Sequence, residues 1–123
     1  MLTLKFGGTS MGNARRILDS TDIVIEQQQK ERVSVIVSAV AGVSNKLQES
    51  IDGSIRGENP ERFVKDLRAV HQEICRELQS KLPGFDSDAV MKSLEDKFFA
   101  TLFLLDHTEH SRWRPTLRWT YQD

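Results

Sequence analysis

The sequence predicts an α/β fold that is rich in helix and contains a parallel sheet. Two segments have the length of strands: Leu2–Phe6 is short and mostly apolar, and Val33–Val37 is rich in β-branched residues. Apolar residues at helical spacing lie between them. A strand, a helix and a second strand in this order form a right-handed unit whose strands are parallel. Three further helical patterns follow, so helices outnumber strands.

The helices before residue 57 are predicted from apolar residues that recur at helical spacing. The first pattern, between the two strands, comprises Ala14, Ile17, Thr21, Val24 and Ile25. The second comprises Leu47, Ile51 and Ile55 and ends before Gly57. Each pattern places its apolar residues on one face, so each helix is expected to pack along that face.

Two longer helices are predicted after residue 57. Asn59 can cap a helix with its amide, and Pro60 suits the first helical position. The pattern that starts there ends at Pro83-Gly84, a pair that stops a helix. A last pattern runs from Val90 to Leu105. These helices are expected to form scaffold rather than carry chemistry.

The first loop has the composition of a phosphate-binding segment. The strand Leu2–Phe6 contains a lysine and leads into two glycines and two hydroxyl residues, which together give the candidate residues Lys5, Gly7, Gly8, Thr9 and Ser10. Glycines let backbone N–H groups approach an anion, a following helix adds the positive end of its dipole, and lysine supplies a full charge. A charge inside an apolar strand also favours a cleft around Lys5 over a solvated position. A tight strand-to-helix turn remains the alternative for the glycine pair.

The spacing of this loop excludes two common phosphate-binding motifs. A Walker A loop ends in Gly-Lys-Ser/Thr, whereas Gly12 is followed by Asn13 and Ala14. A dinucleotide fingerprint that starts at Gly7 requires glycine at the position of Thr9.

A second loop of small and hydroxyl residues follows the second strand. It reads Ser38-Ala-Val-Ala-Gly-Val-Ser-Asn45 and precedes a helix. Because parallel strands have their carboxyl ends at one edge of the sheet, both loops should meet at the edge where such sheets bind ligands. Ser44 and Asn45 also have the residue types of a helix cap, so capping remains open for them.

The paired motifs resemble those of aspartate kinases, which are members of the amino-acid kinase superfamily. The resemblance rests on Lys5-Phe-Gly-Gly-Thr-Ser10 and on the segment from Ser38 to Asn45, and it covers residues 1 to about 57. From there to about residue 105, the chain agrees with the family only in its pattern of helices. The resemblance implies an αβα sandwich around a parallel sheet, of which this chain would be the amino-terminal, substrate-side part.

The resemblance also implies a reaction and roles for residues. The reaction is transfer of the ATP γ-phosphoryl group to the side-chain carboxylate of aspartate, the first step toward lysine, threonine and methionine. Lys5 would contact the transferring phosphate, Gly7 and Gly8 would donate N–H groups, and the hydroxyls of Thr9, Ser10 and Ser38 would surround the phosphates. Ser44 occupies a position where the family has threonine in contact with the substrate amino acid. ATP and Mg²⁺ are the implied cofactors. Mg²⁺ would be held mainly by the nucleotide and by the ATP-binding half of the family's domain, which lies outside this chain, and no residue of the chain is expected to be a metal ligand.

Composition limits the other function classes. Seventeen basic and eighteen acidic side chains give a net charge of −1, which predicts no attraction to nucleic acid or to anionic membranes. No apolar run approaches the roughly 20 residues that span a bilayer, and no signal peptide precedes Lys5, so a cytoplasmic location is expected. Cys75 is the single cysteine and is expected to be a small core residue.

Four helical patterns with two strands leave too little sheet to cover the apolar faces. This imbalance indicates a truncated domain with exposed apolar helix faces, which are expected to promote self-association. Together with the resemblance, it implies that residues 1–110 are a partial amino-acid kinase domain that is inactive alone. Residues 111–123 are expected to be a tail of unclear origin, and His107 with His110 is interpreted as a polar helix end. Two alternatives stay open: a non-catalytic regulatory module that retains the glycine loops, and a helical interaction module in which the glycine turns are structural.

Overall fold

The computed structural model describes residues 1–110, except for the side chains of residues 107–110. The elements in chain order are β1 (Leu2–Phe6), the 3₁₀ helix η1 (Gly8–Met11), α1 (Ala14–Gln28), β2 (Val33–Val37), α2 (Val43–Ile55), α3 (Glu61–Lys81) and α4 (Ser87–His110). The helix-rich α/β prediction is confirmed, and both strands have the predicted bounds. The expected tail and the interpretation of His107 and His110 concern parts of the chain outside this description.

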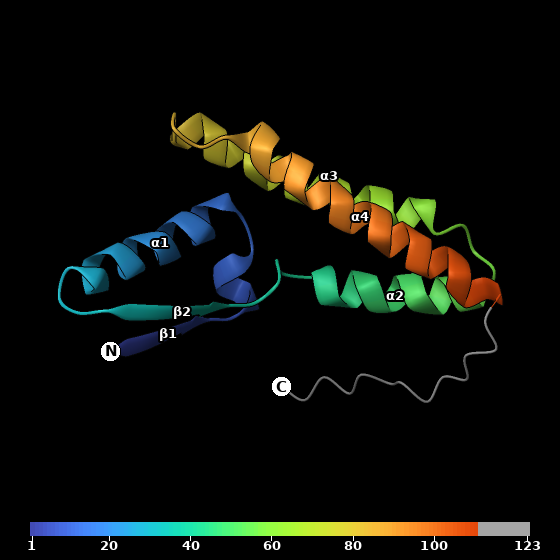
Figure 1. The fold of residues 1–123 in the computed structure, drawn as a ribbon, viewed down its shortest axis with the longest axis horizontal. Helices are drawn as coiled ribbons and strands as arrows, with labels where there is room; N and C mark the ends of the chain where they lie inside the picture. Colours follow the sequence, from blue (N-terminus) through green and yellow to red (C-terminus); the bar gives the residue numbers. More distant parts are fainter. Residues whose placement is uncertain (111–123) are drawn as a thin grey trace.

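The two strands form a parallel sheet, in register from Leu2 beside Val33 to Phe6 beside Val37. Helix α1 connects them and lies along the sheet (Figure 1). Because successive side chains of a strand point to opposite faces, Lys5 lies on the face opposite to Leu4 and Phe6. Phe6 is buried and Lys5 is exposed, so the apolar side of β1 packs while the lysine stays in solvent.

Two asparagines accept hydrogen bonds from backbone N–H groups where helices begin, Asn13 as the N-cap of α1 and Asn59 one residue before the N-cap of α3. The Oδ1 atom of Asn13 accepts a hydrogen bond from the Arg16 N–H at 2.9 Å and starts α1. The Oδ1 atom of Asn59 accepts one from the Glu61 N–H at 3.0 Å, as the sequence predicts. Pro60 precedes the first helical residue of α3 instead of being that residue. The predicted start of α3 is therefore confirmed to within one position.

Helices α2, α3 and α4 share the main hydrophobic core. In Figure 1, α3 and α4 form an antiparallel hairpin, and α2 lies beside α4. The buried core residues are Val43, Val64, Leu67, Phe98 and Leu105. Cys75 is 5% exposed, which confirms that it is a small core residue.

Small residues of α2, rather than its isoleucines, are the most buried. Ser50, Gly53 and Ser54 are buried, and a Cβ atom at Gly53 would lie 2.8 Å from ring atoms of Phe63. Glycine at this position therefore lets the aromatic ring of α3 approach the α2 backbone.

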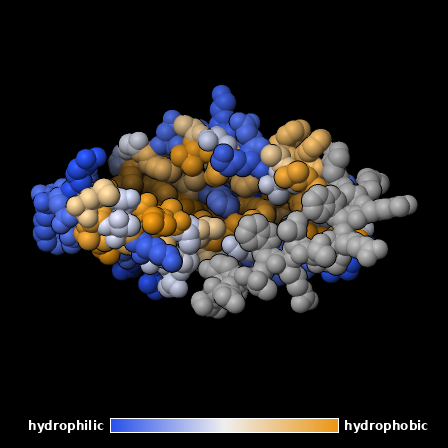
Figure 2. Space-filling model, turned by 60° about the horizontal axis from the view of Figure 1, so that its bottom comes forward, coloured by the Kyte–Doolittle hydropathy of each residue, from blue (hydrophilic) through white to orange (hydrophobic). Residues whose placement is uncertain are grey.

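Several apolar side chains remain on the surface. Val35, Ile36 and Val37 are 42%, 51% and 58% exposed, although alternate residues of a strand face opposite sides of the sheet. Figure 2 shows apolar residues around a hollow on the side that carries the strands and α2. This exposure agrees with the expectation that two strands cannot cover the apolar faces, whereas self-association stays a prediction. No helix in the described part of the chain has the length and apolar character needed to cross a membrane.

Candidate active site

The loops that follow β1 and β2 meet at one edge of the sheet. The Ser38 N–H donates a hydrogen bond to the Phe6 carbonyl at 3.0 Å, which extends the strand ladder by one residue. The Ala41 N–H donates to the Met11 carbonyl at 3.4 Å. The prediction that both glycine-bearing loops share the carboxyl edge is confirmed.

The first loop is held in a short 3₁₀ turn. Gly7 has extended backbone angles, with φ −80° and ψ −176°, and its carbonyl accepts the Ser10 N–H at 3.1 Å. The hydroxyl of Ser20 on α1 donates to the Ser10 carbonyl at 3.3 Å and to the Arg16 carbonyl at 3.0 Å. Ser20 is 6% exposed, so a buried hydroxyl fixes the loop to α1. Sequence analysis did not single out Ser20.

Gly42 sets the direction in which the second loop enters α2. Its φ is +83°, in the left-handed region that glycine adopts without strain. The next N–H group, that of Val43, donates to the Val40 carbonyl at 3.0 Å. No side chain caps α2, so the capping interpretation of Ser44 and Asn45 is wrong. Both residues instead lie in the first turn of the helix, beside a cavity.

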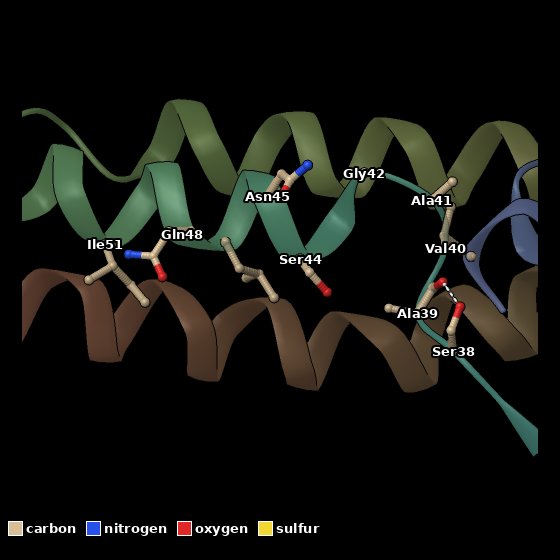
Figure 3. A pocket seen from close by; sticks show the side chains of 11 residues that line it. Ser38, Ala39, Val40, Ala41, Gly42, Ser44, Asn45, Gln48 and Ile51 are labelled. Carbon is tan, nitrogen blue, oxygen red and sulfur yellow. Dashed lines mark hydrogen bonds between the residues drawn. The ribbon is translucent and has the colours of Figure 1, made fainter. Parts of the chain in front are cut away.

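This cavity has a volume of about 520 Å³ and is bounded by both loops and by one side of α2. Figure 3 shows Ser44, Gln48 and Ile51 along α2 and the segment from Ser38 to Gly42 at the end of the cavity. The lining residues are Gly8, Ser38, Ala39, Val40, Ala41, Gly42, Ser44, Asn45, Leu47, Gln48 and Ile51. A Cβ atom at Gly8 would lie 3.8 Å from Ser38 Oγ, so the first loop directly adjoins the second.

Three of the seven predicted site residues, Gly8, Ser38 and Ser44, line this cavity together. The other four, Lys5, Gly7, Thr9 and Ser10, do not line it. Lys5 is exposed, because strand alternation places its side chain on the face of β1 opposite to the buried Phe6, whereas the sequence favoured a cleft around it. Lys5 is nevertheless one residue from Phe6, whose carbonyl bonds the second loop.

The cavity is suited to an anion without containing a charged side chain. Its polar groups are backbone atoms, two serines, one asparagine and one glutamine. The amino end of α2 adds the positive end of the helix dipole, although the Val43 N–H at this end is already bonded to the Val40 carbonyl. A Cβ atom at Gly7 would meet nothing within 4 Å, so the backbone of the first loop can be approached closely. The polar groups of the cavity and the backbone of the first loop are therefore chemically suited to bind phosphate.

The described residues fit a metal ion less well. No group of three histidine, cysteine, aspartate or glutamate side chains that could hold a metal occurs among them. A magnesium ion at this edge would therefore depend on phosphate oxygens for most of its ligands.

Sequence analysis missed most of the cavity wall formed by α2. Gln48 and Ile51 follow Ser44 by four and seven residues, which places all three on one face of the helix. This spacing was the sequence signal that could have identified Gln48 and Ile51 as neighbours of Ser44 on the cavity wall.

No model of a protein family matches the chain. Curated relatives do match it in part. A bifunctional aspartokinase/homoserine dehydrogenase of Buchnera aphidicola subsp. Acyrthosiphon pisum is 28% identical over 75% of this chain and 12% of its own length. The aspartokinase of Chlamydia pneumoniae is 32% identical over 67% of the chain and 18% of its own length, and that of Chlamydia muridarum is 37% identical over 63% and 16%. The chain thus resembles part of an aspartokinase and spans less than a fifth of the length of these relatives.

Proposed function

We propose that residues 1–110 form the substrate-side part of an aspartate kinase domain, in which the cavity between the two loops and α2 holds the acceptor amino acid beside the transferring phosphate. The substrates are ATP and aspartate, and the product is aspartyl phosphate. The observation that carries the proposal is the meeting of Gly8, Ser38 and Ser44 in one cavity at the carboxyl edge of a parallel sheet. The partial similarity to aspartokinases supports the choice of reaction.

Each loop has a separate task in this proposal. The first loop offers the N–H groups of Gly7 and Gly8 to phosphate oxygens, with the hydroxyls of Thr9 and Ser10 close by. The second loop offers the Ser38 hydroxyl, which donates to the Ala39 carbonyl at 2.6 Å. A phosphate oxygen is a stronger acceptor than this neutral carbonyl, so the hydroxyl can turn to the ligand.

Lys5 neutralises charge on the transferring group. Its side chain is exposed and long, and its Cα atom lies one residue before the edge where the loops meet. Phosphoryl transfer spreads negative charge over the equatorial oxygens, so a nearby ammonium group stabilises the transition state more than the ground state. ATP supplies the phosphoryl group, and Mg²⁺ on its phosphates supplies further positive charge.

Ser44 contacts the amino-acid substrate. It lies in the first turn of α2, on the cavity wall, and no capping bond engages its side chain. A hydroxyl can donate to a carboxylate or accept from an ammonium group, so either end of aspartate is a suitable partner.

Nucleotide binding by the chain tests this proposal directly. We expect Mg-ATP to shift the amide NMR signals of Gly7, Gly8, Ser38 and Ser44 in the ¹⁵N-labelled chain, and adenosine, which lacks phosphate, to leave them unchanged. Ser38→Ala should weaken ATP binding several-fold through loss of one hydrogen bond to a charged group. Ser80→Ala, which changes an exposed serine of α3, is the matched control and should not alter binding.

Two outcomes would contradict the proposal. Absence of ATP-induced shifts at the loops would favour a helical interaction module with structural glycine turns. Binding of ATP without turnover, even when the remainder of a relative's domain is supplied, would favour a non-catalytic regulatory module.

A further inference from the structure

Gln48 occupies a position on the cavity wall that the proposed roles leave unassigned. It follows Ser44 by one helical turn and lines the same cavity, between the apolar side chains of Leu47 and Ile51. Figure 3 shows the Gln48 amide oxygen and the Ser44 hydroxyl on the same side of α2. The two groups therefore offer a pair of neutral polar atoms to one ligand.

A neighbouring carboxylate orients the Gln48 amide. The Nε2 group donates a hydrogen bond to Asp52 Oδ1 at 3.2 Å, one further turn along α2. With the amide nitrogen directed toward Asp52, the amide oxygen is left as an acceptor on the cavity side. Asp52 itself does not line the cavity.

We propose that Gln48 recognises the α-ammonium group of the amino-acid substrate and thereby distinguishes an amino acid from a plain dicarboxylate. This inference rests on the proposed function, which places the reactive carboxylate beside Gly8 and Ser38. The cavity lining contains no carboxylate, so an ammonium group there must be bound by neutral acceptors. The Gln48 oxygen and the Ser44 hydroxyl are such acceptors, and a hydrogen bond from a charged donor is stronger than a neutral one.

The position along α2 agrees with this role. One turn of helix advances about 5.4 Å, so Gln48 lies farther along the cavity wall from the phosphate-binding loops than Ser44, and both side chains are exposed. In aspartate only three bonds separate the ammonium nitrogen from the reactive carboxylate carbon, so the Gln48 side chain meets this nitrogen by reaching back toward Ser44, the direction that helical side chains favour. Ile51, one turn farther along α2, also lines the cavity and has an apolar side chain. The Asp52 carboxylate behind Gln48 also favours positive charge at this end.

A purely structural role makes a different prediction. Glutamine and aspartate four residues apart stabilise an exposed helix through their side-chain hydrogen bond. In that case Gln48 affects helix stability and has no influence on which ligand binds.

Comparison of L-aspartate with succinate tests the inference. Succinate is the same dicarboxylate without the ammonium group, and both ligands can be titrated into the ¹⁵N-labelled chain of 123 residues. We expect the chain to bind aspartate about tenfold more tightly than succinate, as a hydrogen bond to a charged group allows. Gln48→Met, which keeps the side-chain length and removes the acceptor, should reduce this preference to less than about twofold.

Three controls separate the possible outcomes. Gln72→Met, at an exposed position of α3, should keep the preference. Mg-ATP should shift the signals of Gly8 and Ser38 equally in the chain and in Gln48→Met, and circular dichroism should show equal helix content. An unchanged preference in Gln48→Met, or equal binding of aspartate and succinate to the unmodified chain, overturns the inference while the ATP shifts uphold the proposed function. Loss of the ATP shifts in the unmodified chain overturns the proposed function itself.

Discussion

Replacement of Gly42 by alanine isolates the backbone conformation that starts α2. Gly42 has φ +83°, and a Cβ atom built on it would meet nothing within 4 Å, so the substitution introduces strain without a steric clash. A non-glycine residue in the left-handed region costs about 1–2 kcal/mol. For a domain of about 100 residues, each kcal/mol lowers Tm by roughly 4–8 °C. We therefore expect Gly42→Ala to lower Tm by roughly 5–15 °C in a calorimetric or circular-dichroism melt.

Gly7→Ala is the matched control for this prediction. A Cβ atom at Gly7 would also meet nothing within 4 Å, but Gly7 has φ −80°, which alanine adopts readily. Its replacement should raise stability by about 0.4–1 kcal/mol, because alanine has fewer unfolded conformations than glycine. Equal melting temperatures for the two variants would refute the reasoning. Gly42→Ala should in addition weaken ATP-induced shifts at Ser44, because Gly42 directs the second loop into the helix.

Four further predictions follow from the packing and the surface. Phe98→Ala should lower the free energy of unfolding by about 3–5 kcal/mol in urea, because Phe98 is 5% exposed at the centre of the core; a loss below about 1 kcal/mol would contradict this. Burial raises the pKa of the Cys75 thiol, so the folded chain keeps this proton where the unfolded chain releases it. Stability should thus fall as pH rises above about 8.5, and a Cys75→Ala variant that showed the same decrease in its urea midpoint would exclude the thiol as the cause. Glu95→Gln should lower stability by less than about 1 kcal/mol, and by less still at high salt, because the 2.7 Å pair of Arg68 Nε with Glu95 is solvent-accessible; a greater loss in urea would show that the pair is not screened. Ile36→Thr should reduce self-association measured by light scattering, since Ile36 is 51% exposed on β2, and a purely monomeric unmodified chain would disprove this.

The strands and helices could be predicted because their signals are local. Leu2–Phe6 and Val33–Val37 are short apolar segments that end at glycines or small residues, and the structure gives them the same bounds. The intervening helix predicts parallel pairing, which places the two loops at the same edge of the sheet. The pair Asn59-Pro60 also marks the start of α3 to within one residue, and the Asn59 amide oxygen accepts the Glu61 N–H.

Features that depend on tertiary contacts could not be predicted in this way. Ser20 looks like an ordinary polar helix residue, and its burial depends on the loop that folds back over α1. Gln48 looks like a solvated surface residue, and its side chain is indeed exposed, but its place on a cavity wall depends on the second loop, which borders the same cavity. The apolar pattern of α2 indicated its isoleucines as the packing face, whereas Gly53 allows the Phe63 ring to approach the small residues instead. For Lys5, strand alternation alone predicts exposure, whereas the charge within an apolar strand favours a cleft.

The most direct test of the proposed kinase function is turnover in a chain completed with the remainder of a related aspartokinase domain, such as that of Chlamydia pneumoniae. Aspartate-dependent ATP consumption would be measured for the completed chain and for its Lys5→Ala variant, with Lys30→Ala as a control at an exposed lysine. The proposal predicts turnover that Lys5→Ala lowers about a hundredfold or more, with little change in KM for aspartate and no change for Lys30→Ala. A rate for Lys5→Ala within about twofold of the unmodified chain, with intact helix content, would contradict the role of Lys5 at the transferring phosphate.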